Sequence, residues 1–229
     1  NCSSTGGDDR CANGTLILGN YIGTRADGEG ALGNGSEFLY PGISFYQVAD
    51  SITRVQIGGT DAGAGNRIAY NTRYGVDHSY LNGYGTLVIG GNQMFANGTR
   101  GIATAGRTND PADVDAGPNR GQNFPVFVSG SQLNGQISAR YAVDTAAANA
   151  SYPLTVHFYR SRDGSGDYYL GQQTYATPQV EQDAVIPVPA GVSVGFVVAL
   201  ATDAAGNTSE FSEALDVDTL LADGFEDAP

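Results

Sequence analysis

The chain has 229 residues, and its 24 acidic residues outnumber 11 basic ones to give a formal net charge of −13. Every basic residue is an arginine, which excludes Schiff-base chemistry on lysine, a P-loop lysine and a lysine general base. The acidity argues against nucleic-acid and anionic-lipid partners, and no apolar run reaches the length of a membrane-spanning segment. We therefore expect an acidic protein that neither binds nucleic acid nor crosses a membrane.

Two cysteines flank a short polar loop near the amino terminus. Cys2 and Cys11 are the only cysteines of the chain, and their spacing suits a local disulfide. Such a pair indicates an oxidising compartment, so we expect a secreted or cell-surface protein. The sequence does not begin with the basic segment and apolar stretch of a signal peptide. We therefore expect either a processed chain or a part of a longer product.

Residues 1–107 carry an internal repeat. The pattern Asn-x-Ile-x-x-Asn-x-x-x-Gly-Val at 66–76 recurs as Asn-x-Met-x-x-Asn-x-x-x-Gly-Ile at 92–102, a displacement of 26 residues. This period, rich in β-branched residues and without a helical pattern, predicts a parallel β-solenoid with inward apolar side chains. The repeated asparagines are expected to form ladders in which each side-chain amide bonds the next coil. A leucine-rich repeat is not favoured, because leucine does not recur at close spacing.

An earlier copy of the repeat is weaker. Asn20-x-Ile22 lies 46 residues before the equivalent positions at 66–68, and Gly42-Ile43 falls near the midpoint, where an intervening copy would lie. If the 46 residues span two coils, each coil has about two dozen residues, close to the 26-residue displacement. The segment is therefore expected to hold roughly four or five coils.

The rest of the chain has a different character. Residues 108–124 are rich in turn formers and acids, and they mark a boundary that is either a linker or a calcium loop. Residues 125–218 alternate short apolar runs with turns, which predicts an antiparallel β-sandwich. Residues 219–229 form an acidic tail that is not expected to contribute a strand to this sandwich. The expected strands are 124–128, 136–141, 154–159, 168–174, 184–188 and 192–202.

Several segments together resemble a known family. They are GNYIGT (19–24), ALGNG (31–35), IGGTDAGAGN (57–66), NDP (109–111), GPN (117–119), QNFP (122–125) and ATDAAGNTSEFS (201–212). In this order they resemble secreted bacterial right-handed parallel β-helix proteins with a final β-sandwich. The resemblance implies an all-β fold, a short right-handed parallel β-helix followed by an antiparallel Ig-like β-sandwich, and an extracellular or surface location, but no established activity. The DGFE at 223–226 is similar to the tails of exported proteobacterial proteins.

A candidate metal site lies in the boundary segment. Asp110, Asp113, Asp115 and Asn119 place four oxygen-bearing side chains within ten residues of a Gly/Pro-rich loop, which suits a hard cation. Three close carboxylates repel one another, so an ordered loop is costly without a counter-ion. The sequence therefore predicts calcium as a structural cofactor. The alternative is a solvated acidic linker, and the spacing is not that of an EF-hand.

Catalysis is an alternative on the solenoid. Arg73, Asp77 and His78 form a compact set that could act in a polysaccharide lyase, with arginine as the base beside acids that bind calcium and a substrate carboxylate. Paired carboxylates for a hydrolase are not suggested by the scattered acids of the repeat. The competing interpretation is that Asp77 and His78 merely form an exposed turn.

Tyrosines offer a second alternative. Tyr70, Tyr74, Tyr80 and Tyr84 lie in the solenoid segment, where ring faces could stack on sugars and form a glycan-binding groove. The competing interpretation is that about half of them pack inward, and the chain has no tryptophan, the strongest sugar-stacking ring.

The patterns favour a non-enzymatic extracellular or cell-surface structural or adhesive protein. An uncapped solenoid end exposes unpaired backbone groups that can pair with another chain. If this end or the tail binds another copy of the protein, repeated contacts would build a chain or filament. Self-association is therefore expected, with an extracellular glycan as a further partner. The alternatives are a polysaccharide lyase or hydrolase and a glycan-binding module, each acting on the β-helix face.

Overall fold

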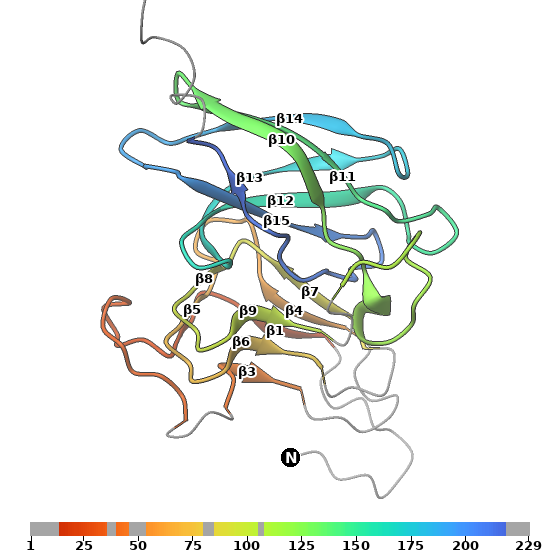
Figure 1. Ribbon diagram of the computed structural model, residues 1–229. Coiled ribbons are helices and arrows are strands. Elements are labelled where there is room, and N and C mark those ends of the chain that lie inside the picture. Colours follow the sequence, from red (N-terminus) through yellow and green to blue (C-terminus); the bar gives the residue numbers. More distant parts are fainter. Residues whose placement is uncertain (1–13, 36–39, 46–53, 80–84, 105–107, 219–229) are drawn as a thin grey trace, which may run out of the picture.

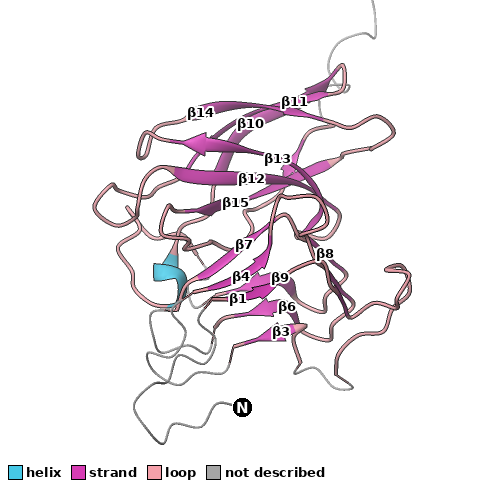
Figure 2. Cartoon of the chain, turned by 180° about the vertical axis from the view of Figure 1, so that it is seen from behind, coloured by secondary structure: helices cyan, strands magenta, loops and turns pink. Residues whose placement is uncertain are grey.

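The computed structural model describes residues 14–35, 40–45, 54–79, 85–104 and 108–218. Within these ranges the chain is all-β, apart from one 3-10 helix, η1 (Pro118–Gly121), drawn in cyan in Figure 2. No helix in the described part is long and apolar enough to cross a membrane. The predicted all-β class is thus confirmed.

Nine short strands form three parallel sheets, which we call the parallel stack. The chain visits the sheets in rotation, so that their strand orders are β1-β4-β7, β2-β5-β8 and β3-β6-β9 (Figure 1). The strands are β1 (Thr15–Ile17), β2 (Tyr21–Ile22), β3 (Ile43–Ser44), β4 (Val55–Gly58), β5 (Arg67–Ala69), β6 (Tyr74–Asp77), β7 (Leu87–Gly90), β8 (Gln93–Phe95) and β9 (Arg100–Ala103).

The strand register explains the repeat and corrects the number of circuits. Arg67 pairs with Gln93 and Val76 with Ile102, which is the 26-residue displacement read from the sequence. Ile22, however, pairs directly with Ile68. The 46-residue interval is therefore one long circuit with an insertion, and the described strands make three circuits rather than four or five.

Alternation along each strand builds the core of the stack. Successive side chains of a strand point to opposite faces, so every second residue turns inward. The inward residues are apolar, and they pack on equivalent residues one circuit away. This cluster of fully buried side chains comprises Val55, Ile57, Ile68, Val76, Leu87, Ile89, Met94 and Ile102.

Two asparagine ladders run along the stack, as the repeat predicted. In the first, the backbone N–H and Nδ2 of Asn20 donate to Asn66 Oδ1 at 2.9 and 3.0 Å, and the same two groups of Asn66 donate to Asn92 Oδ1 at 3.0 and 2.9 Å. A second ladder connects Asn34, Asn71 and Asn97 in the same manner. Each asparagine side chain thus joins consecutive circuits, beside backbone hydrogen bonds such as those from Arg67 N–H to the Asn20 carbonyl and from Gln93 N–H to the Asn66 carbonyl, both at 2.8 Å.

The second half of the chain forms two antiparallel sheets around a shared core, which we call the two-sheet unit. The sheet orders are β10-β11-β14 and β13-β12-β15-β16, and each of the six expected strands has a counterpart. Tyr141, Phe158 and Tyr175 are buried between the sheets. The strands are β10 (Val126–Leu133), β11 (Gln136–Ala142), β12 (Leu154–Ser161), β13 (Gly166–Tyr175), β14 (Gln182–Pro187), β15 (Phe196–Thr202) and β16 (Leu215–Asp216).

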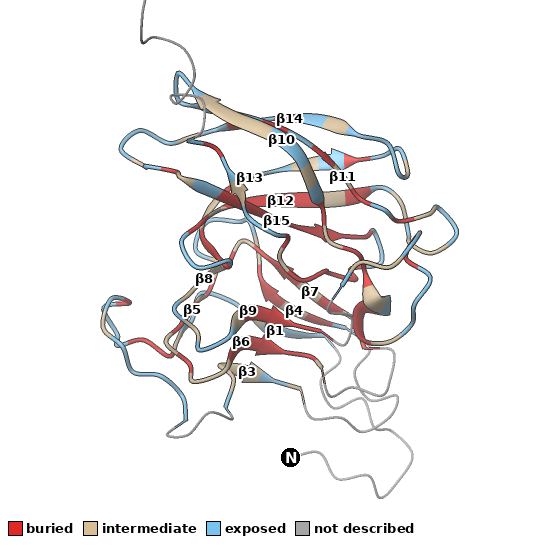
Figure 3. Ribbon diagram, viewed as in Figure 1, coloured by how far each residue is buried: buried red, intermediate tan, exposed pale blue. Residues whose placement is uncertain are grey.

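The two-sheet unit closes one end of the parallel stack. Tyr159, Val198 and Leu200 point out of the sheet of β12 and β15 and are buried against the core of the stack. Figure 3 shows β12 and β15 largely in red, as buried strands beside the stack. Side chains also accept hydrogen bonds from the backbone N–H groups of the last circuit, and so replace a neighbouring strand. These bonds are Leu87 N–H to Asn119 Oδ1, Ile89 N–H to Thr208 Oγ1, Gly91 N–H to Tyr159 Oη and Thr104 N–H to Glu210 Oε1.

Candidate functional site

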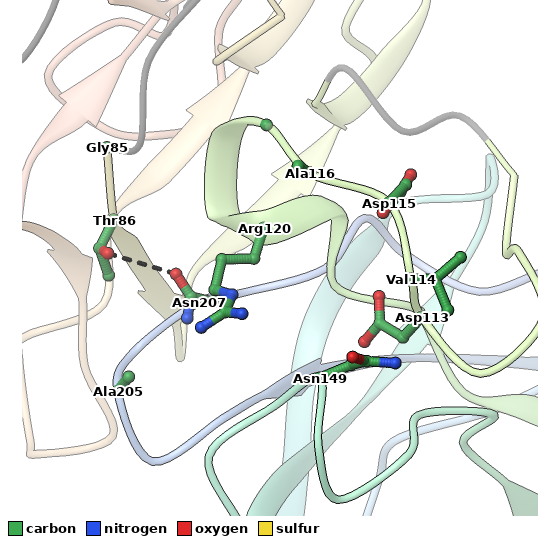
Figure 4. Close-up of a pocket in the computed structure, with 11 residues that line it drawn as sticks. Gly85, Thr86, Asp113, Val114, Asp115, Ala116, Arg120, Asn149, Ala205 and Asn207 are labelled. Carbon is green, nitrogen blue, oxygen red and sulfur yellow. Dashed lines mark hydrogen bonds between the residues drawn. The ribbon is translucent and has the colours of Figure 1, made fainter.

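A pocket of about 570 Å³ lies where the two units and the segment between them meet (Figure 4). One wall consists of Gly85 and Thr86, just before β7, and a second consists of residues 113–117 and Arg120. Loops of the two-sheet unit supply Asn149 and Asn207. Thr86 Oγ1 donates to Asn207 Oδ1 at 3.2 Å, so the parallel stack and the two-sheet unit are joined beside the pocket.

Three carboxylates gather at this junction. Oxygens of Asp110, Asp113 and Asp115 all lie within 4.8 Å of one another, as the metal-site prediction required. Asp113 is only 3% exposed, and its Oδ2 accepts hydrogen bonds from Gln122 Nε2 at 2.9 Å and Thr145 Oγ1 at 2.8 Å. The other oxygen of Asp113 is buried without a hydrogen-bond partner among the described residues, and so is Asp110 Oδ1. Two acceptor positions in the cluster are therefore left for a ligand.

Burial and mutual repulsion perturb the cluster. The pKa of Asp113 is raised to about 6, mainly by desolvation and to a smaller extent by the charges of Asp115 and Asp110, against the lowering effects of the Thr145 hydroxyl and the Asn123 backbone. Desolvation, followed by the charge of Asp110, also raises the pKa of Asp115. Arg120 lines the same pocket, but within the described ranges it forms no ion pair. Among the described residues, no arginine forms an ion pair with the cluster.

The backbone that presents Asp113 is held by the two-sheet unit. Ala112 and Asp113 have φ values of 63° and 62°, a left-handed conformation that residues with a Cβ rarely adopt. The carbonyl oxygen of Ala112 accepts hydrogen bonds from the backbone N–H of Ala146 at 3.1 Å and from Asn149 Nδ2 at 2.9 Å. Gln122, Thr145 and Asn149 carry no repeated pattern, so the sequence could not identify them as partners of the cluster.

Asn119 has a different role from the one predicted. Its Oδ1 accepts from the backbone N–H of Leu87 at 2.6 Å, and its Nδ2 donates to the carbonyls of Leu87 at 3.0 Å and Thr208 at 2.6 Å. The amide of Asn119 therefore caps the edge of β7 and is not part of the carboxylate cluster. An asparagine suits either role, which is why the sequence did not distinguish them.

Two of the three residues of the proposed catalytic set are not accessible. Asp77 and His78 are wholly buried, so the prediction of an exposed turn is wrong. Asp77 Oδ1 accepts from the N–H and hydroxyl of Ser79 at 2.9 and 2.6 Å, and Arg73 lies over the ring of Tyr74, 3.8 Å from Asp77 Oδ2. Burial lowers the pKa of His78 to about 3, so its imidazole is neutral at physiological pH. No substrate reaches Asp77 or His78 in this conformation, whereas Arg73 is partly exposed.

The predicted tyrosine platform is not assembled among the described residues. Tyr74 is buried beneath Arg73, and Tyr70 is half-buried with its ring edge-to-face against Phe95 at 5.5 Å. The remaining positions of the sequence predictions lie outside the described residues: Tyr80, Tyr84, Cys2, Cys11 and the tail at 219–229.

Comparisons with known proteins add little. No protein-family model matches the chain, and no curated protein is significantly similar to it. A solved structure of a DUF3823 family protein from Bacteroides ovatus is similar with a TM-score of 0.33 and 13% sequence identity. The match covers 54% of this chain and 61% of that one, which is less than two thirds of its length. A likeness of this strength carries no argument about fold or function.

Proposed function

We propose that the protein is a non-enzymatic structural or adhesive module of the extracellular space or cell surface. In this proposal the parallel stack is a short right-handed β-helix, and the two-sheet unit is an Ig-like β-sandwich that closes its last coil. The rotation of the chain through three parallel sheets and the two asparagine ladders support the first assignment. The shared core of two antiparallel sheets supports the second. The extracellular setting rests on the family resemblance and on the spacing of Cys2 and Cys11.

In the same proposal, calcium holds the segment between the two parts. The support is the pair of buried carboxylate oxygens on Asp110 and Asp113 that find no hydrogen-bond partner in the described part of the chain, together with the exposed Asp115 beside them. Calcium takes six to eight oxygen ligands, so solvent or backbone carbonyls would complete a shell that three carboxylates begin. The role of the ion would be to fix the angle between stack and sandwich.

The difference between the two ends of the stack carries the functional proposal. Side chains of the two-sheet unit occupy the edge of the last circuit, whereas none of the described strands pairs with the outer edges of β1, β2 and β3. Leu16 and Leu18 on this free end are 61% and 37% exposed. No described donor reaches Asn20 Oδ1, although the equivalent oxygens of Asn66 and Asn92 each accept two hydrogen bonds.

A second copy of the chain is the proposed occupant of the free end. Because the other end of the stack is closed, two free ends that meet produce a symmetric pair rather than an open chain. A filament would need a further contact surface, for which 219–229 is the candidate segment. The proposed unit of assembly is therefore a dimer that joins two β1 edges.

The test is the molar mass in solution, measured by light scattering over a wide concentration range with calcium and with chelator. We expect a concentration-dependent dimer. Replacing Leu16 and Leu18 together by lysine should raise its dissociation constant by roughly tenfold or more, because edge lysines block strand pairing and symmetry places like charges opposite one another.

The matched control is Leu133→Lys, since Leu133 is 69% exposed at the far end of the two-sheet unit. This variant should dimerise like the unmodified protein. A monomer at every concentration, or equal weakening by Leu133→Lys, would contradict assembly through the free end.

A further inference from the structure

A second groove, of about 380 Å³, lies along the outer face of the sheet formed by β2, β5 and β8. Ile68 and Met94 point inward from this sheet, so their neighbours Arg67 and Gln93 point outward. The opposite wall is the glycine-rich turn at 59–65, and Tyr169 of β13 also lines the groove. The groove shares no residue with the carboxylate cluster, and its end at Tyr21 reaches the first circuit of the stack.

The floor of the groove is a row of three side chains in register. Tyr21 pairs with Arg67, and Arg67 with Gln93, so one side chain per circuit is presented at the strand spacing of about 4.8 Å. Tyr21 is 57% exposed and offers an aromatic ring at one end. Tyr169 belongs to β13, which lies beside β8, and brings a second ring to the groove.

Arg67 is held in place with donors to spare. Its guanidinium lies 5.0 Å from the centre of the Phe95 ring, which fixes its plane. Its Nη2 is 3.2 Å from Glu29 Oε1, but the Glu29 side chain is 76% exposed, and an ion pair of that kind contributes little. The buried Nε–H of Arg67 has no acceptor within the described part of the chain. Because the ion pair with Glu29 is weak, ligand oxygens can compete with Glu29 for Nη2 of this guanidinium.

The opposite wall adds an acceptor and close backbone approach. Asp61 is exposed on the turn, and its carbonyl accepts the N–H of Ala64 at 3.0 Å, which closes the turn. Gly63 has a φ of +79° with open space where a side chain would begin, and Gly59 and Gly65 also line the groove. A ligand can therefore contact main-chain groups on this side and side chains on the other.

We propose that this groove binds a neutral oligosaccharide. Aromatic faces pack on the apolar faces of sugar rings, and planar carboxylate, amide and guanidinium groups bond ring hydroxyls. Tyr21 supplies the platform, while Arg67, Gln93 and Asp61 supply donors and acceptors. The positive charge of Arg67 is balanced by Glu29 and Asp61, and the chain as a whole carries −13, which disfavours acidic polysaccharides. The proposal is independent of dimer formation.

Titration calorimetry with defined saccharides tests this assignment at a concentration where light scattering gives a monomer. The probes are cellohexaose, mannohexaose and chitohexaose, with an oligogalacturonate as the acidic comparison. We expect at least one neutral probe to bind, and Tyr21→Ala to weaken it by roughly tenfold. The matched control is Tyr40→Ala, because Tyr40 is 59% exposed and does not line the groove.

Gln93→Ala is the second variant, and it should weaken binding without altering the aromatic platform. Thermal unfolding of each variant verifies that it is folded. Binding by none of the neutral probes, tighter binding of the oligogalacturonate, or equal weakening by Tyr40→Ala would overturn the proposal. A protein that stays monomeric at every concentration and yet binds a neutral probe through Tyr21 would refute the assembly proposal and leave this one standing.

Discussion

Replacing Asn66 by alanine is expected to lower the free energy of unfolding by about 2–4 kcal/mol, because several buried groups lose their partners at once. Asn66 is 1% exposed in the middle of the first ladder. Its Oδ1 accepts both hydrogen bonds from Asn20, and its Nδ2 donates to the carbonyl of Ile17 at 2.7 Å and to Asn92 Oδ1 at 2.9 Å. The small alanine side chain also leaves a void at the corner of the stack.

Urea denaturation monitored by circular dichroism measures this effect. Asn20→Ala is the matched control, since Asn20 is exposed at the end of the same ladder and its removal leaves Asn66 bonded to Asn92. We expect the control to cost less than about 1 kcal/mol. Similar losses for both variants would mean that the ladder does not act as a buried, cooperative connection between circuits.

The metal-free protein is expected to lose stability as the pH rises from about 4 to about 6. Asp113 has a pKa of about 6 in the folded chain against 3.8 for the unperturbed group, so in this window the folded state binds more protons than the unfolded state. Stability is then present in full below pH 4 and falls as the buried carboxyl ionises. The loss amounts to roughly 2–3 kcal/mol, to which the raised pKa of Asp115 adds in the same direction.

Calcium should reverse this loss above pH 6, because the ion replaces the missing partners of the ionised carboxylates. A concentration of 100 times the dissociation constant stabilises the folded state by about 2.7 kcal/mol. Asp113→Asn should be about 2 kcal/mol more stable than the unmodified protein in chelator at pH 7, since a neutral amide avoids the charge burial and its oxygen can still accept from Gln122 and Thr145. The same variant should gain nothing from calcium.

Thermal unfolding at a series of pH values, with calcium and with chelator, measures both effects. The exposed Asp218→Asn variant serves as a control for the loss of one charge and should behave like the unmodified protein. If calcium leaves the unfolding curve of the unmodified protein unchanged at pH 7, the acidic segment is a solvated linker, which is the alternative that the sequence left open.

The features predicted correctly from the sequence depend on patterns of residues that lie close together along the chain. The all-β class, the 26-residue displacement and the ladders depend on residues that recur with a fixed period, and each circuit must present the same side chain to the next. The clustering of Asp110, Asp113 and Asp115 also follows from their closeness in sequence within a turn-rich segment. These features are encoded by neighbours along the chain, so one sequence is enough to reveal them.

The features that the sequence did not predict depend on contacts between segments that are distant along the chain. The sheet of β12 and β15 is buried on both faces, because Phe158 and Val197 face one core while Tyr159 and Val198 face the other. Alternation alone predicted a sandwich but not that this sheet would also close the stack. Tyr21, Arg67 and Gln93 likewise share a groove only because strands far apart in sequence pair in register.

The sequence by itself thus determined the strand content, the repeat period and the acidic cluster, since each depends on spacing along the chain. The tertiary structure alone decided the number of circuits, the buried state of Asp77 and His78, and the use of Asn119 at the edge of β7. An asparagine or a histidine has the same identity in a core, at a sheet edge or at a ligand site. Its role is set by the groups that folding brings against it, and those come from other parts of the chain.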